Sequence, residues 1–114
     1  KGRIIGIDVR PPTLDLKGCE FHICNQVDKR ELDRIFCDTK FDIIIDDGCH
    51  QIDYQISSKM FLFDKLNDGG LYIIEDIQNP EEDIKKLSKT GPLKVLDMRH
   101  LTGRYDDMLV VFEK

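Results

Sequence analysis

Short apolar runs alternate with amphipathic stretches along the whole chain. Two of these runs, residues 41–45 and 71–74, are too short for a helix, and each stops at a pair of acids. Runs of this length are typical of strands that are buried on both faces of a parallel sheet. Residues 3–7 form a similar run that ends at Asp8. Residues 20–24 alternate polar and apolar positions, which indicates a half-exposed strand near a sheet edge.

Two stretches in the first half of the chain have the pattern of helices. Asp28 begins the first helix, and Glu31 lies at the capping-box position. Its buried face is expected to hold Leu32, Ile35 and Phe36. The second helix is expected over residues 54–66, and its apolar stripe consists of Ile56, Met60, Phe63 and Leu66. Residues 67–70, Asn-Asp-Gly-Gly, should end it, because glycine readily adopts the left-handed conformation of a helix C-terminus.

The second half of the chain contains one more helix and two final strands. Asn79 and Pro80, followed by two acids, predict a helix start, and the Gly91-Pro92 pair should end that helix. Residues 93–96 and 108–112 predict the strands, and the polar residues 99–107 link them.

The order of these elements predicts an α/β fold. Strands that alternate with helices form a mostly parallel sheet with helices on its faces. The last two strands follow each other without an intervening helix, so the final strand should be antiparallel. With 114 residues and no internal repeat, the chain is expected to form one domain over residues 1–114.

Composition narrows the possible partners. The net charge of −5 argues against a nucleic-acid partner, because phosphate binding requires a basic surface. No apolar stretch approaches the roughly 20 residues that span a bilayer, so we expect no membrane segment. The spacing of the four cysteines matches no zinc motif and favours free thiols; they are Cys19, Cys24, Cys37 and Cys49. Free thiols are typical of a reducing compartment, and we expect a cytoplasmic location.

Acidic residues follow both buried strands at the point where each strand ends. Ligands of open α/β sheets bind at the carboxyl ends of the strands, so these acids should converge on one cleft together with His50. The acids are Asp46, Asp47, Glu75 and Asp76. The set suits a hard cation and a proton transfer. Structural roles stay open: Asp46 could cap the next helix, Asp76 could be a turn residue, and His50 could start a surface helix.

Four segments occur in an order that resembles a known family. They are G-I-D-V at residues 6–9, N-Q-V-D at 25–28, I-I-D-D-G-C-H at 44–50 and L-N-D-G-G-L-Y-I-I-E-D at 66–76. On these motifs the chain resembles the second, larger part of a class I S-adenosylmethionine-dependent methyltransferase. Within that group it is similar to the metal-dependent sugar O-methyltransferases of macrolide biosynthesis and to rhamnosyl O-methyltransferases and cephalosporin hydroxylases. The resemblance implies a Rossmann-like methyltransferase fold that is truncated at its N-terminus.

The resemblance implies a role for each matching residue. Asp8 would accept hydrogen bonds from the ribose of S-adenosylmethionine, as a carboxylate at a strand end can. Asn25 and Gln26 fall where the family contacts the adenine, and Asp46 is also expected to be a cofactor-binding residue. Three acids match the family's magnesium ligands: Asp47, Glu75 and Asp76. His50 matches the candidate general base. The chain departs from the family at Asn25, where an acid is usual, and at Cys49, where a serine is usual.

The resemblance also leaves two arrangements open. In the family, the glycine-rich loop that cradles the cofactor follows a first strand, and both would lie upstream of Lys1. That strand lies between the strands that here end at Asp8 and Asp46. The chain is therefore either a fragment of a longer protein or a sheet that has closed up with those two strands adjacent.

Two functions from different classes follow. The first is metal-assisted, S-adenosylmethionine-dependent O-methylation of a hydroxyl on a small-molecule acceptor, a sugar or glycosylated natural product, catalysed by the parent protein. The alternative is a non-catalytic interaction or assembly module, and an exposed sheet edge would favour a homo-oligomer. A receiver-like domain is a third reading, but it needs a lysine at a later strand end, and Lys94 begins a strand.

Overall fold

The strands form two separate sheets. The computed structural model describes residues 2–15 and 17–114, and the expectation about what precedes Lys1 lies outside these residues. The smaller sheet is the parallel pair of β1 (Ile4–Asp8) and β2 (Cys19–Ile23). The larger sheet has the order β3-β4-β6-β5, formed by β3 (Phe41–Asp46), β4 (Leu66–Ile74), β6 (Met108–Glu113) and β5 (Lys94–Asp97).

Strand directions in the larger sheet confirm the predicted pattern. β3 and β4 are parallel, whereas β6 is antiparallel to both of its neighbours, β4 and β5. Three strands therefore run one way, and only the last strand of the chain opposes them. The α/β class, the mixed sheet and the antiparallel last strand follow the sequence pattern.

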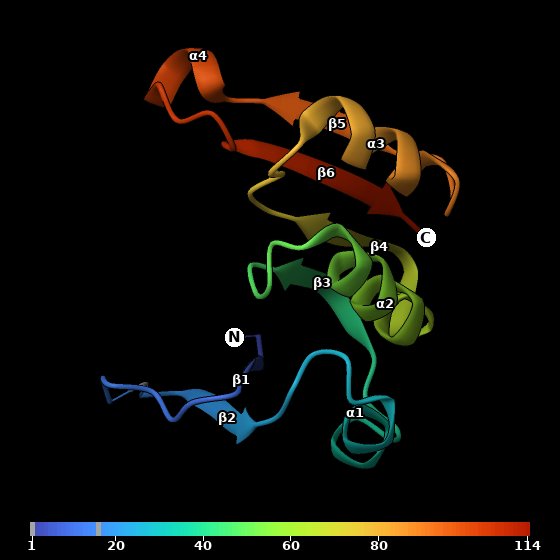
Figure 1. The fold of residues 1–114 in the computed structure, drawn as a ribbon. Helices are drawn as coiled ribbons and strands as arrows, with labels where there is room; N and C mark the ends of the chain where they lie inside the picture. Colours follow the sequence, from blue (N-terminus) through green and yellow to red (C-terminus); the bar gives the residue numbers. More distant parts are fainter. Residues whose placement is uncertain (1, 16) are drawn as a thin grey trace.

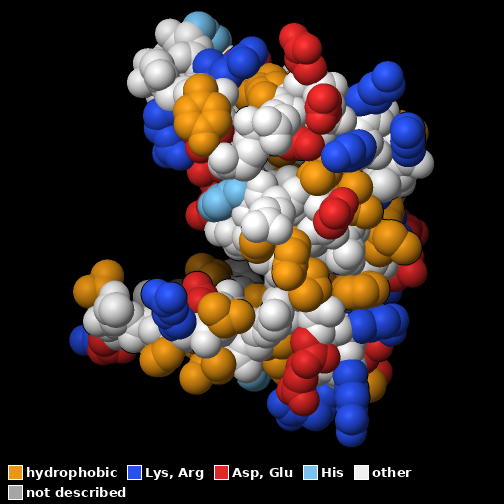
Figure 2. Space-filling view, viewed as in Figure 1, with side chains coloured by type: hydrophobic (Ala, Val, Ile, Leu, Met, Phe, Trp, Pro, Cys, Tyr) orange, Lys and Arg blue, Asp and Glu red, His pale blue; other side chains and the backbone are white. Residues whose placement is uncertain are grey.

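β1 and β3 do not pair, so the sheet has not closed up between them. Figure 1 shows β1 and β2 as an arm below the larger sheet, and Figure 2 shows that the molecular surface is hollowed between this arm and the larger sheet. The arm is joined to the larger sheet through α1 (Lys29–Ile35), which follows β2 along the chain. Asp28 caps this helix as expected, because its side chain accepts a hydrogen bond from the Glu31 N–H.

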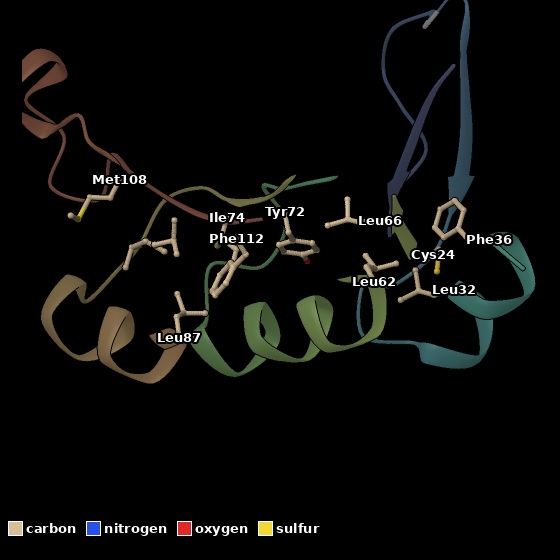
Figure 3. Packing of buried hydrophobic residues seen from close by; sticks show 12 residues of the cluster. Cys24, Leu32, Phe36, Leu62, Leu66, Tyr72, Ile74, Leu87, Met108 and Phe112 are labelled. Carbon is tan, nitrogen blue, oxygen red and sulfur yellow. The ribbon is translucent and has the colours of Figure 1, made fainter. Parts of the chain in front are cut away.

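Two helices cover one face of the larger sheet. They are α2 (Ile52–Leu62) and α3 (Pro80–Ser88), and Figure 3 shows Leu87, Phe112, Tyr72 and Leu62 packed between these helices and the strands. The same buried cluster continues to α1 through Leu32, Phe36 and Cys24. One core therefore joins the arm to the larger sheet. All four cysteines are free, as the sequence predicts.

The opposite face of the larger sheet is not covered within the described residues. Ile43 and Ile45 on β3 are 55% and 59% exposed, and Leu96 on β5 is 51% exposed. The expectation that β3 is buried on both faces is therefore wrong. A run of consecutive apolar residues alternates between the two faces of a strand, and only the Ile44 side meets helices here.

The second helix differs most from its prediction. It ends at Leu62, the 3₁₀ turn η1 (Phe63–Lys65) follows, and Leu66 already begins β4. Met60 is 66% exposed rather than buried. Polar residues occupy the buried face instead, and each has a specific contact. Ser58 hydrogen-bonds Tyr72, and the Lys59 ammonium donates to the Thr90 carbonyl and lies 4.2 Å from the Phe112 ring centroid. Burial lowers the pKa of Lys59.

Residues 67–70 are part of β4 and do not form a loop after a helix. The pairing with β3 shifts between Phe41↔Leu66 and Ile43↔Leu71, so the extra residues form an irregularity in the strand. Gly69 has a φ of +78°, which favours glycine at that position. The linker after β5 also contains a short helix, α4 (Arg99–Thr102), which the polar composition does not predict.

A core leucine tests this description of the fold. Leu87 on α3 has no exposed surface, whereas Leu101 on α4 is 69% exposed. We expect Leu87→Ala to lower the free energy of unfolding by about 2–5 kcal/mol, because it removes buried methyl groups and leaves a cavity. Leu101→Ala makes the same chemical change and should stay within about 0.5 kcal/mol of the parent chain. Urea denaturation followed by circular dichroism measures both, and equal effects would contradict the placement of α3.

Candidate functional site

The carboxyl ends of β3 and β4 lie side by side. The two strands are parallel and pair up to Asp46↔Ile74, and the Glu75 N–H donates to the Asp46 carbonyl at 3.0 Å. The acids that follow each strand therefore meet at one edge of the sheet. Asp47, His50 and Asp76 each offer a ligand atom, and these atoms all lie within 4.8 Å of one another.

This spacing is close to what a small cation requires. Oxygen atoms on opposite sides of Mg²⁺ lie about 4.2 Å apart, twice the usual Mg–O distance. Carboxylates suit Mg²⁺ better than imidazole does, so Asp47 and Asp76 fit as ligands and His50 fits as a neighbouring proton acceptor.

Glu75 lies beside the group of Asp47, His50 and Asp76, but its carboxylate is not part of it. Partial burial raises the pKa of Glu75, and the negative charges of Asp47, Asp76 and Asp107 raise it further. Carboxylates this close repel one another unless a cation or a proton compensates them. The crowding is a physical reason for a cation to bind here.

Asp46 is buried, and its carboxylate is held from several directions. It accepts from the Gln26 side-chain amide at 3.0 Å, from the Tyr72 hydroxyl at 3.1 Å and from the Gly48 N–H at 3.3 Å. Burial raises the pKa of Asp46, and these hydrogen bonds partly oppose that shift. Asp46 does not cap α2, which begins at Ile52 after Gln51. Its carboxylate instead holds the loop between β3 and α2.

The other predicted cofactor residues lie at the ends of the arm's strands. Asp8 ends β1 and is exposed; its Oδ1 accepts the Arg10 N–H at 2.8 Å, and it lines a cavity of about 380 Å³ with Arg10, Pro12 and Phe21. Asn25 follows β2 and accepts the Val27 N–H at 3.1 Å. The structure thus places Asp8 and Asn25 on the arm and the acidic group on the larger sheet.

His50 is half-buried at the start of the segment that leads into α2. Its Nδ1 is buried and has no hydrogen-bond partner among the described residues. The residue also lines a cavity of about 260 Å³ between the first turns of α2 and α3, together with Gln51, Gln78 and Asn79. An imidazole that lines a polar cavity can take a proton from a hydroxyl bound there.

Arg104 was not expected at the site from the sequence. It follows α4, and its guanidinium donates to Asp76 Oδ2 at 3.0 Å and lies 3.4 Å from Asp106 Oδ1. Asp76 itself has a φ of 54°, which is uncommon for a residue other than glycine. Nothing in the linker's polar composition distinguishes Arg104 from its neighbours, so no sequence signal could have identified it.

Comparisons with known proteins show which proteins this chain resembles. No family model matches the chain. Over 79 residues, 68% of this chain, it is 37% identical to 8-demethyl-8-(2-methoxy-alpha-L-rhamnosyl)-tetracenomycin-C 3'-O-methyltransferase of Streptomyces olivaceus. Over 37 residues it is 49% identical to 8-demethyl-8-alpha-L-rhamnosyl tetracenomycin-C 2'-O-methyltransferase of the same organism. The structure of MycE methyltransferase from the mycinamycin biosynthetic pathway, in complex with Mg, SAH and mycinamycin VI, matches 98% of this chain with a TM-score of 0.71 and 25% identity. The chain is related to the S-adenosylmethionine-dependent methyltransferases.

The match covers only part of each relative. It spans 20% and 10% of the two Streptomyces proteins and 36% of MycE. A fibrillarin pre-rRNA processing protein of Methanococcus jannaschii matches 96% of this chain with a TM-score of 0.70 at 18% identity. That likeness shows the fold alone, and the fold is the Rossmann-like methyltransferase fold that the sequence predicts. None of the helices in the described residues combines the length and the apolar character needed to cross a bilayer.

The ion pair at Asp76 gives a prediction about cation binding in this methyltransferase fold. Arg104 donates to Asp76 Oδ2 and would compete with a cation for this carboxylate, and exposed ion pairs contribute up to about 1 kcal/mol. We therefore expect Arg104→Gln to raise the Mn²⁺ affinity about two- to fivefold in calorimetric titration. Arg99→Gln is the matched control, because Arg99 loses the same charge but pairs with Asp97 instead. A weaker Mn²⁺ affinity in Arg104→Gln than in the control would contradict competition at Asp76.

The raised pKa of Glu75 gives a prediction about stability without metal. A carboxyl whose folded pKa lies above its unfolded value stabilises the fold when protonated, and this contribution is lost as pH rises through the folded pKa. Glu75→Gln should therefore stabilise the metal-free protein at neutral pH, and the difference from the parent chain should shrink as pH falls and Glu75 itself gains a proton.

Urea denaturation at several pH values in the presence of a chelator measures this difference. The matched control is Glu113→Gln on β6, whose carboxylate is largely exposed and lies near Lys94. A Glu75→Gln protein that is less stable than the parent chain at neutral pH would show that the acids do not repel one another as described.

Proposed function

We propose that this chain forms the metal-binding part of an O-methyltransferase that uses S-adenosylmethionine and Mg²⁺ to methylate a hydroxyl of a sugar on a natural product. The observation that carries this proposal is the group of Asp47, His50 and Asp76 at the ends of two parallel strands. The likeness to rhamnosyl O-methyltransferases and to MycE supports it.

In this proposal, the carboxylates of Asp47, Glu75 and Asp76 hold Mg²⁺. The bound ion would lower the pKa of an acceptor hydroxyl and orient it. The repulsion that raises the pKa of Glu75 supports this role, since a cation would relieve it. Arg104 must then leave Asp76, and its exposed position allows this, because its side chain is 60% accessible to solvent.

His50 would accept the proton of the acceptor hydroxyl. Methyl transfer to oxygen forms a carbon–oxygen bond and breaks the carbon–sulfur bond of the donor, and the hydroxyl proton must leave. The polar cavity that His50 lines and its position beside Asp47 and Asp76 support this assignment. A positioned general base contributes about 10²–10⁴ in rate.

Cofactor binding is assigned to residues at or just after the carboxyl ends of β1, β2 and β3. Asp8 would accept hydrogen bonds from the ribose hydroxyls, and its exposure beside a cavity supports this role. Asn25 and Gln26 would lie near the adenine. Asp46 would act on cofactor binding indirectly, by holding the Gln26 side chain, because its buried carboxylate already has hydrogen-bond partners within the chain.

A second candidate function is a non-catalytic interaction module. The exposed Ile43 and Ile45 on the uncovered face favour it, because contiguous apolar surface often marks an interface. Within residues 2–15 and 17–114, β3 pairs only with β4, and an edge strand of this kind suits pairing with another copy. This candidate does not require the acidic group to bind a cation, and that difference separates the two functions.

Calorimetric titration with S-adenosylmethionine and Mg²⁺ tests the proposal. We expect Mg²⁺ to bind the parent chain and Asp47→Asn to abolish this binding, because a neutral amide is a much poorer ligand for a hard cation. Asp68→Asn is the matched control, since Asp68 is exposed near the opposite end of β4. S-Adenosylmethionine should bind more tightly to a longer protein that contains this chain than to the chain alone.

Two results would count against the proposal. Equal Mg²⁺ binding by the Asp47→Asn protein and the parent chain would place the metal elsewhere. A folded parent chain that binds neither ligand, in the longer protein as well, would favour the interaction module.

A further inference from the structure

We propose that Gln26 is a positioning residue that holds the loop of residues 47–50, and through it the groups of Asp47 and His50, in place for the metal and the acceptor. This inference rests on the proposed function. It differs from the adenine contact that the family resemblance implies for Gln26, because it assigns the side-chain amide to the metal loop.

The side chain of Gln26 bridges the two sheets. It follows β2 in the arm, yet its Nε2 donates to Asp46 Oδ1 at 3.0 Å, and its Oε1 accepts the Cys49 N–H at 2.7 Å. Asp46 ends β3, and Cys49 lies in the loop that follows it. Both ends of the amide are therefore engaged across the junction between the arm and the larger sheet.

The chemistry of these partners fixes the orientation of the amide. A carboxylate only accepts and a backbone N–H only donates, so the nitrogen must face Asp46 and the oxygen must face Cys49. Asp46 is itself held by Tyr72, whose hydroxyl also hydrogen-bonds Ser58 at 2.8 Å. The loop thus rests on a buried chain of hydrogen bonds that reaches α2.

Gly48 shows how closely the loop lies against Gln26. A Cβ at position 48 would overlap the Gln26 side-chain oxygen. Asp47 precedes Gly48 in the sequence, and Cys49 and His50 follow it. A shift of the backbone at Gly48 or Cys49 would therefore move the ligand atoms that now lie within 4.8 Å of Asp76.

Two substitutions at Gln26 separate positioning from charge. Gln26→Met keeps the length of the side chain and removes both hydrogen bonds. Gln26→Glu keeps an acceptor for Cys49 but places a carboxylate against Asp46, and its added negative charge would by itself attract a cation. Asn25→Asp is the matched control, because it adds the same charge at the neighbouring residue and can still accept the Val27 N–H.

The measurement is the Mn²⁺ affinity of the full chain by calorimetry, with circular dichroism and thermal unfolding to confirm the fold. We expect both Gln26 variants to bind Mn²⁺ about 10- to 100-fold more weakly, as when other residues that orient metal ligands are changed. Asn25→Asp should bind Mn²⁺ at least as tightly as the parent chain. A folded Gln26→Met protein with unchanged Mn²⁺ affinity would overturn the inference.

A metal-free readout keeps this inference separate from the proposed function. Hydrogen exchange of the Cys49 amide, followed by NMR, should speed up in Gln26→Met whether or not the chain binds a metal. If neither the parent chain nor the longer protein binds Mn²⁺, the proposed function fails, whereas unchanged exchange at Cys49 would by itself overturn the positioning role.

Gly48→Ala serves if the Gln26 variants do not fold. It keeps the Gln26 residue and forces its side-chain amide and the loop apart, whichever of the two moves, so the hydrogen bond to Cys49 is lost. Weaker Mn²⁺ binding by Gly48→Ala would support the inference, and unchanged binding would overturn it.

Discussion

The structure depends on one buried carboxylate. Asp46 ends β3 at the junction of the arm and the larger sheet, and a buried charge is strongly destabilising unless donors surround it. Its donors come from the loop after β2, from β4 and from the loop that leads to α2. Satisfying Asp46 therefore brings together three segments that are distant in the sequence, and the acidic group forms beside them.

The sequence predicts those features that follow from periodicity and from strand ends. The short apolar runs predict the strands. Because β3 and β4 are parallel, Asp47 and Asp76 lie together at the carboxyl ends of these strands, as predicted. Asp28 capped its helix because the capping interaction is local. The two Streptomyces relatives and MycE agree with the family that the motifs at residues 44–50 and 66–76 indicate.

The sequence does not predict features that depend on tertiary contacts. The apolar pattern of the second helix predicts Met60 in the core, because Ser58 and Lys59 have polar side chains. In the folded chain, however, Ser58 hydrogen-bonds Tyr72. Lys59 lies over two aromatic rings, and no local pattern predicts these contacts. Arg104 reaches Asp76 across 28 positions, and no local pattern reports such a contact. Tyr72 was the one available signal, because a phenol within a buried strand must find a polar partner.

The arm and the larger sheet contain different numbers of strands, and we expect the smaller unit to be the less stable of the two. The arm has two strands, and the hollow separates β1 from β3. Local unfolding begins where few buried contacts hold a segment. The arm is therefore the segment expected to open first, as a cooperative unit. Each opening would withdraw Gln26 from Asp46, so fluctuations of the arm and the order of the acidic loop would be thermodynamically linked.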